Sequence, residues 1–73
     1  MTFDELPPFI EYHFGPENLQ RICQQGMHIL FERARGIPGL VVPMLKKILA
    51  ESKPDGPIDP FTLDDILQRW ELT

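Results

Sequence analysis

The sequence predicts an all-α fold, a compact orthogonal bundle of about four short helices that forms a single helical domain over residues 1–73. In four successive segments, apolar residues recur at the i, i+3, i+4, i+7 spacing of one helix face. Eight prolines and five glycines separate these segments. No segment shows the strict apolar–polar alternation of a half-buried strand. Four amphipathic helices joined by short turns would bury their apolar faces in one small core.

The first helix is expected to begin near Pro7 and to end at Gly15, after a capping box formed by Thr2 and Glu5. Proline is tolerated in the first turn of a helix but not further along, which places the helix start at this proline. The apolar residues of the segment are Leu6, Phe9, Ile10 and Phe14.

The second and longest helix is expected to run from Pro16 or Glu17 to Arg35, with Gly36 as its C-terminal cap. Glu17 and Arg21 have the i, i+4 spacing of a favourable ion pair. Gly26 lies inside the apolar stripe, where it either lets another backbone approach or marks a break that splits the helix in two. The stripe comprises Leu19, Ile22, Cys23, Gly26, Met27, Leu30 and Ala34.

The third helix is expected from Leu40 to Ser52, with Pro43 in its first turn. Its core face contains Val41, Met44, Leu45, Ile48 and Leu49. A proline-rich loop then leads to Thr62, which is expected to cap a final helix that runs to about Glu71. The stripe of this last helix contains Leu63, Ile66, Leu67 and Trp70.

Composition limits the location and the kind of a working site. A chain of 73 residues buries a small core, so a functional site has to lie on the surface or be shared with a partner. One cysteine cannot form an internal disulfide, and no segment approaches the ~18 apolar residues of a membrane span. No secretory signal is recognisable. We therefore expect a cytoplasmic protein with no membrane contact.

Motifs for catalysis and for cofactor binding are missing, so we expect no catalytic, cofactor-binding or metal-binding residues and no enzyme activity. Glycine-rich phosphate loops and metal-binding signatures are absent from the sequence. His13 and His28 are expected to be ordinary surface histidines. Cys23 is expected to be buried and inert in its apolar stripe. The aspartates between residues 55 and 65 lack EF-hand spacing and are explained by turns and helix caps.

Two groups of residues are candidates for binding a partner. Arg33, Arg35, Lys46 and Lys47 flank the turn at residues 36–39 and either form a positive patch for phosphate or an acidic partner, or are simply solvated. Trp70 is either a core residue or an exposed anchor. Phe61 and Ile58 are expected to cover the edge of the core.

Residues 31–52 contain a helix end, a short R-G-I-P turn at residues 35–38, and a helix with an L-x-x-L-L-type pattern at residues 44–49. Thr62–Asp65 supplies a later helix start with acidic residues. Over Phe31–Asp65 this arrangement resembles the helical lid of AAA+ ATPases of the transposition ATP-binding or secretion-ATPase type. The resemblance implies either an excised lid or a free-standing relative used for docking. In such lids a nucleotide-sensing arginine commonly follows the proline of the turn, and here that position is Gly39. The nucleotide-binding subdomain is also absent. The resemblance therefore implies no nucleotide hydrolysis in this chain.

The leading functional hypothesis is a non-catalytic, lid-like interaction module that docks onto a protein partner through the Arg33–Lys47 edge or the Ile58–Trp70 segment. A DNA-binding helix-turn-helix or winged-helix relative is the first alternative, although the net charge of −4 and the lack of a basic recognition helix count against nucleic acid. A small homodimeric regulatory or assembly factor is the other alternative.

Overall fold

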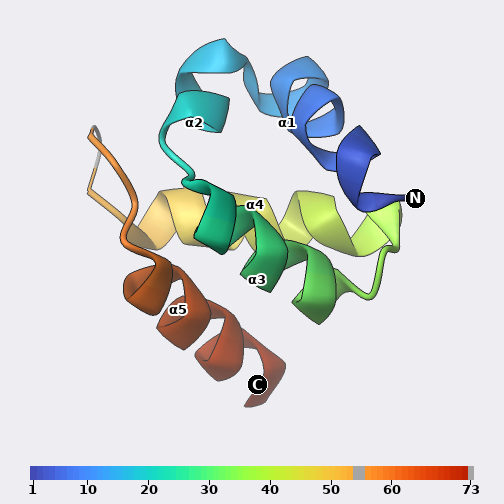
Figure 1. Ribbon diagram of the computed structural model, residues 1–73. Helices are drawn as coiled ribbons and strands as arrows, with labels where there is room; N and C mark the ends of the chain where they lie inside the picture. Colours follow the sequence, from blue (N-terminus) through green and yellow to red (C-terminus); the bar gives the residue numbers. More distant parts are fainter. Residues whose placement is uncertain (54–55, 73) are drawn as a thin grey trace.

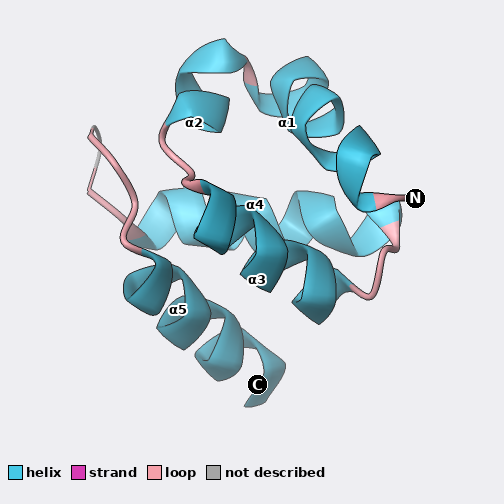
Figure 2. Ribbon diagram, viewed as in Figure 1, coloured by secondary structure: helices cyan, strands magenta, loops and turns pink. Residues whose placement is uncertain are grey.

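Five α-helices and one short 3-10 helix make up the described part of the chain, and Figures 1 and 2 show their arrangement in a computed structural model. The structure describes residues 1–53 and 56–72, without the side chains of residues 71 and 72. Within these residues no strand forms, so the predicted all-α class is confirmed. The elements are η1 (Phe3–Glu5), α1 (Leu6–Phe14), α2 (Pro16–Gln20), α3 (Gln24–Ala34), α4 (Pro38–Glu51) and α5 (Pro60–Leu72).

The N-terminal prediction is confirmed in its main points. The Glu5 carboxylate accepts hydrogen bonds from the backbone N–H and the hydroxyl of Thr2, both at 3.0 Å, and so closes the capping box over η1. The helix α1 follows without interruption and has Pro7 in its first turn. It ends at Gly15, whose φ of 89° lies in the region that favours glycine.

The second predicted helix is wrong as a single element, because the chain breaks between α2 and α3. Cys23 is extended (φ −75°, ψ 169°), and Ile22 forms an isolated parallel bridge with Ile58 from the loop before α5. The Ile58 N–H donates to the Arg21 carbonyl at 2.8 Å, which makes this junction a tertiary contact rather than a helical turn. The break therefore lies just before Gly26 and not at it.

Gly26 instead allows close side-chain packing. A Cβ at this position would lie 3.3 Å from Leu63 Cδ1 and 3.1 Å from Ile22 Cγ2, so the glycine lets a leucine of α5 approach the first turn of α3. The predicted close approach is thus made by a side chain and not by a backbone.

The side chain of Arg21 joins the break between α2 and α3 to the loop before α5. Its guanidinium donates to the carbonyls of Gly56 (2.9 Å) and Lys53 and to Ser52 Oγ (3.3 Å). These bonds occupy the side chain, so the predicted ion pair with Glu17 does not form. Arg21 thereby joins the end of α2 to the end of α4.

The turn between α3 and α4 uses two residues with positive φ, Arg35 at 56° and Gly36 at 69°. Such a left-handed pair is a common way to end a helix, and Arg35 is unusual in it because non-glycine residues avoid this region. Pro38 occupies the first turn of α4, so α4 begins before the predicted Leu40. Pro43 therefore lies inside the helix and not in its first turn.

The start of α5 also differs from the prediction. The helix begins at Pro60, and the Asp59 carbonyl accepts from the Leu63 N–H at 3.0 Å. This bond puts Asp59 at the position that caps the helix, so Thr62 lies within the first turn and is not the cap.

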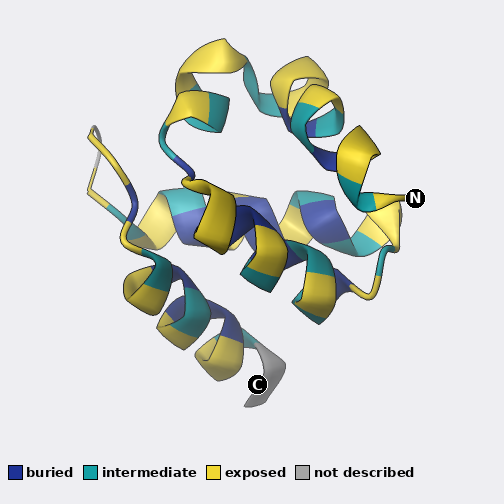
Figure 3. Cartoon of the chain, in the orientation of Figure 1, coloured by how far each residue is buried: buried dark blue, intermediate teal, exposed yellow. Residues whose placement is uncertain are grey.

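The core lies where the helical stripes meet, and Figure 3 shows the buried residues on the inner sides of the helices. In the described chain, every buried side chain is apolar. α5 packs against both α3 and α4, and α1 packs mainly against α2. Cys23 is the exception among the predicted stripe residues, since it is exposed. The buried core residues are Leu6, Ile10, Ile22, Met27, Leu30, Ala34, Val41, Met44, Leu45, Ile48, Ile58, Leu63, Ile66 and Leu67.

Candidate functional surfaces

The four basic candidates do not gather in one unpaired patch. Arg33 forms an ion pair with Asp64 of α5 at 2.7 Å, and Lys47 pairs with Glu51 one turn later in α4 at 3.1 Å. Within the described residues, Arg35 and Lys46 form no ion pair and are exposed. Two of the four charges are thus engaged within the fold, and two remain for an external ligand.

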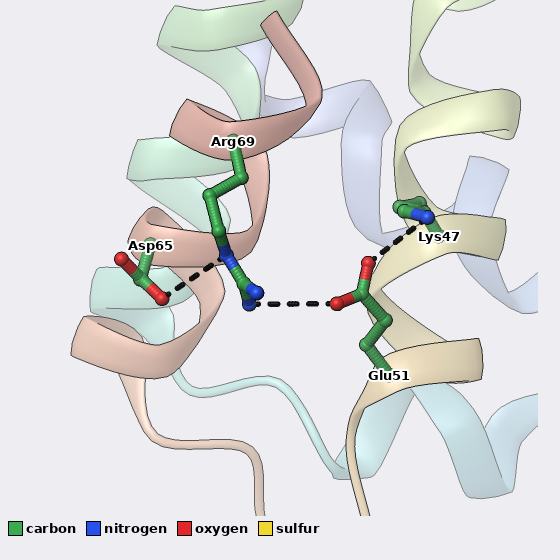
Figure 4. A network of polar contacts seen from close by, with 4 residues as sticks. All are labelled: Lys47, Glu51, Asp65 and Arg69. Atoms are coloured by element: carbon green, nitrogen blue, oxygen red, sulfur yellow. Dashed lines mark ion pairs between the residues drawn. The ribbon is translucent and has the colours of Figure 1, made fainter. Parts of the chain in front are cut away.

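Figure 4 shows how the paired charges connect α4 with α5. Glu51 forms ion pairs with Lys47 and with Arg69 of α5, the latter at 3.4 Å. Arg69 in turn pairs with Asp65 at 3.3 Å, one turn earlier in its own helix. The network alternates in sign and lies at the surface, so it offers no concentrated positive charge.

A shallow recess of about 380 Å³ lies beside the Arg33–Asp64 pair. Its charged lining consists of Arg33, Arg35, Glu32 and Asp64, two of each sign. A phosphate group placed there would meet carboxylates as well as guanidinium groups. The recess therefore does not have the charge that phosphate binding requires.

The aromatic candidates of α5 have different environments. Phe61 is 77% exposed in the first turn, so the expectation that it covers the core edge is wrong. Ile58 does cover that edge and is 5% exposed. Trp70 is half-buried and packs against the core, as expected of a core residue near the chain end.

A groove that sequence reasoning missed lies between η1, α1 and the start of α4. It is a shallow, open depression of about 600 Å³, lined by Met1, Glu5, Pro8, Phe9, Tyr12 and Pro38. We call it the N-terminal groove. The positively charged terminal ammonium group of Met1 donates to the Gly36 carbonyl at 3.1 Å and so links the two sides of the groove. Tyr12 is 86% exposed, and Ile37, which precedes Pro38, is 49% exposed.

The spacing of the groove residues contains the signal that was overlooked. Glu5, Pro8, Phe9 and Tyr12 follow the i, i+3, i+4, i+7 pattern, so α1 carries a second stripe beside the one that enters the core through Leu6 and Ile10. The position of Tyr12, three residues after Phe9 and four after Pro8, was the visible sign of this stripe.

Glu5 lines the groove as a carboxylate with a lowered pKa. The first cause is the hydrogen bond from the Thr2 backbone N–H, and the second is the bond from the Thr2 hydroxyl. Both bonds favour the charged form of the acid. The groove therefore keeps a negative charge at its rim over the physiological pH range.

The histidines and the cysteine lie apart from one another. His28 stacks on Phe3 with ring centroids 4.2 Å apart, and His13 contacts Phe9 at 4.4 Å. Cys23 caps α3, its sulfur accepting from the Gly26 N–H at 3.4 Å; the prediction that it is buried is wrong. No group of three possible metal ligands occurs in the part of the chain that the structure describes.

Comparison with known proteins adds no relative: no family model matches the chain, and no curated protein or solved structure matches it at a significant level. In the described chain, no helix combines the length and apolar character needed to cross a bilayer.

Proposed function

We propose that the chain is a helical protein-interaction module that docks onto a protein partner through exposed apolar side chains. The observation that carries the proposal is the exposure of Tyr12, Ile37 and Phe61 on a domain whose core is already filled with apolar residues. Large exposed apolar and aromatic side chains are typical anchors of protein interfaces. They are not needed to complete this core.

The exposed apolar residues belong to two separate surfaces. Tyr12 lines the N-terminal groove, Ile37 directly precedes the lining residue Pro38, and Phe61 lies at the start of α5. Arg35 and Lys46 are the basic residues of the predicted edge that remain for contact with a partner. A lid-like module would use the turn at residues 36–39 together with α4 and α5, the segments on which the AAA+ resemblance rests.

Site-specific photo-crosslinking tests the proposal directly. A photoreactive phenylalanine analogue is placed at Tyr12 in one variant and at Phe61 in another, with exposed Gln68 as the control position. Irradiation in the native lysate is expected to join at least one of the two apolar positions to a defined protein, while Gln68 yields no such product. Equal labelling from all three positions, or none from any of them, would contradict the proposal.

Two further measurements distinguish the partner class. Light scattering over a dilution series detects a homodimer, which is the form of the proposal in which the partner is a second copy. Retention on heparin at low salt would favour a nucleic-acid ligand instead.

The Arg35→Asn and Lys46→Gln variants test the basic edge without disturbing an ion pair. Asparagine is chosen at position 35 because it tolerates the left-handed conformation of that residue. Undiminished crosslinking in both variants would remove that edge from the interface.

A further inference from the structure

We propose that the N-terminal groove binds a basic amphipathic segment of a partner protein, with a large apolar side chain in the groove and lysine or arginine residues around it. This inference rests on the proposed interaction function and adds the site and the chemistry of the partner. Two independent properties of the groove support it, its rigid apolar lining and the charge of the segment that forms it.

Three residues of the apolar lining, Pro8, Phe9 and Pro38, have restricted freedom before any partner binds. Pro8 and Pro38 have restricted backbones, and each lies in the first turns of its helix. Phe9 packs against the core and contacts the ring of His13 at 4.4 Å. Tyr12 contacts the same ring edge-on at 5.0 Å. Little conformational entropy is then lost when an apolar side chain enters the groove.

The charge of the groove selects a basic partner. Residues 1–20 contain four carboxylates and no lysine or arginine, whereas residues 21–73 contain seven acidic and seven basic residues. The side-chain net charge of −4 therefore belongs to the segment that carries the groove, where the terminal ammonium of Met1 offsets one of the four carboxylates. Glu5 lines the groove, and Glu11 is exposed next to Tyr12 in α1. Such a surface attracts cationic side chains and repels phosphate backbones and anionic lipids.

The same charge argues against a second copy of this chain as the occupant. A two-fold symmetric contact through the groove would bring the same surface of each copy together. Glu5 and Glu11 of one copy would then face those of the other. Like charges across an interface are unfavourable, so a different protein with basic residues fits the groove better.

Binding of designed peptides to the intact chain tests the proposal. The probe is an amphipathic helical peptide of leucine and lysine, and its matched control keeps the leucines but replaces every lysine with glutamate. Binding is measured by calorimetry and mapped by amide chemical shifts in the full chain. We expect the lysine peptide to bind and to shift the amides of Tyr12, Ile37 and their neighbours. The glutamate peptide is expected not to bind, and the affinity of the lysine peptide should fall as NaCl rises from about 0.05 M to about 0.5 M.

Matched variants locate the site. Tyr12→Ser is expected to weaken the lysine peptide by about tenfold, the loss typical of one aromatic anchor. Gln68→Ser changes an exposed polar side chain of α5 and should leave the affinity unchanged. Glu11→Lys should weaken binding without altering the apolar lining. Circular dichroism checks that all three variants keep their helical content.

The outcomes separate this inference from the proposed function. Equal binding of both peptides would overturn the basic-segment assignment, and equal losses in Tyr12→Ser and Gln68→Ser would overturn the groove as the site. Shifts confined to α5, or crosslinks from Phe61 alone, would overturn the groove as the site while leaving the interaction module in place. A chain that binds neither peptide and yields no crosslink from Tyr12 or Phe61 would overturn both proposals.

Discussion

The N-terminal segment (residues 1–20) and the three-helix unit (α3, α4 and α5) differ in how they use apolar and charged residues. Ten of the fourteen core residues come from the three-helix unit, whereas α1 contributes two and α2 none. The unit engages many of its charges in ion pairs between and within its helices. The N-terminal segment has unbalanced acidic charge and exposes Tyr12.

The difference indicates that, within the 73 residues, one region mainly stabilises the fold and the other mainly exposes a surface. A domain of this size has only a few kcal/mol of stability, and most of it has to come from the buried core. The three-helix unit supplies most of the buried apolar surface. The N-terminal segment attaches to it through Leu6 and Ile10 and can present its other face to a partner.

The largest expected effect is a fall in the free energy of unfolding when one core side chain of the three-helix unit is shortened. Leu45→Ala leaves a cavity at a fully buried position in α4 and should lower the free energy of unfolding by about 2–5 kcal/mol, most of the stability of such a domain. Tyr12→Ala, at an exposed position, should change it by less than about 0.5 kcal/mol. Urea unfolding followed by circular dichroism measures both. Comparable losses of unfolding free energy in the two variants would contradict this difference between the two regions.

A smaller effect is expected at the junction between the two regions. Arg21→Lys keeps the charge but cannot donate to Gly56, Lys53 and Ser52 at once, because an ammonium group lacks the planar fork of guanidinium. We expect a loss of about 1–2 kcal/mol in the free energy of unfolding, moderated because the group is only partly buried.

The control for this variant is Arg69→Lys. Its side chain is 60% exposed and makes only surface ion pairs, so the expected loss is below about 0.5 kcal/mol. If Arg69→Lys proved as costly as Arg21→Lys in the same urea titration, the junction would have no special role in joining the two regions.

A gain in stability is expected at Cys23, the cap of α3. A serine hydroxyl accepts a hydrogen bond from the helix N-terminus better than a thiol does, so Cys23→Ser should raise the free energy of unfolding by about 0.5 kcal/mol, whereas Cys23→Ala should lower it. Thermal unfolding of the three proteins gives the order. If Cys23 were buried instead, the serine variant would be less stable than the alanine variant. That order of stability would contradict the role of Cys23 as the cap of α3.

Much of the fold could be predicted because it follows from local chemistry. The capping box at Thr2, the end of α1 at Gly15 and the core faces of α4 and α5 are encoded in residues close together in the sequence. The break at Cys23 could not be predicted in this way. The apolar spacing continues through it, and its cause is the pairing of Ile22 with Ile58, a contact between distant parts of the chain.

The candidate surfaces were predicted less well than the fold. The sequence places Arg33 and Lys47 near one turn, but their ion-pair partners depend on how α5 packs against α3 and α4. The N-terminal groove needs both the second stripe of α1 and the start of α4 at Pro38. The stripe was present in the sequence, whereas the neighbour that completes the groove is a product of tertiary packing.

The smallest expected effect concerns the pH dependence of the N-terminal segment. The pKa of Glu5 is lowered from its ordinary value of 4.5 by the hydrogen bonds from Thr2. A carboxyl group with a lower pKa in the folded state stabilises that state above the unfolded pKa, and its contribution is lost as the pH falls through the folded pKa. In Glu5→Gln this contribution is absent at every pH. The urea midpoints of the two proteins should therefore differ at neutral pH and converge as the pH falls through the folded-state pKa of Glu5.

Amide signals can show which region responds. If the N-terminal segment is only loosely coupled to the three-helix unit, acidification should change the signals of Thr2 to Glu5 while those of α3–α5 stay in place. A uniform response of all helices would show instead that the two regions open together. The groove would then be a face of one cooperative unit, and a partner bound there would stabilise the entire domain rather than its first two helices.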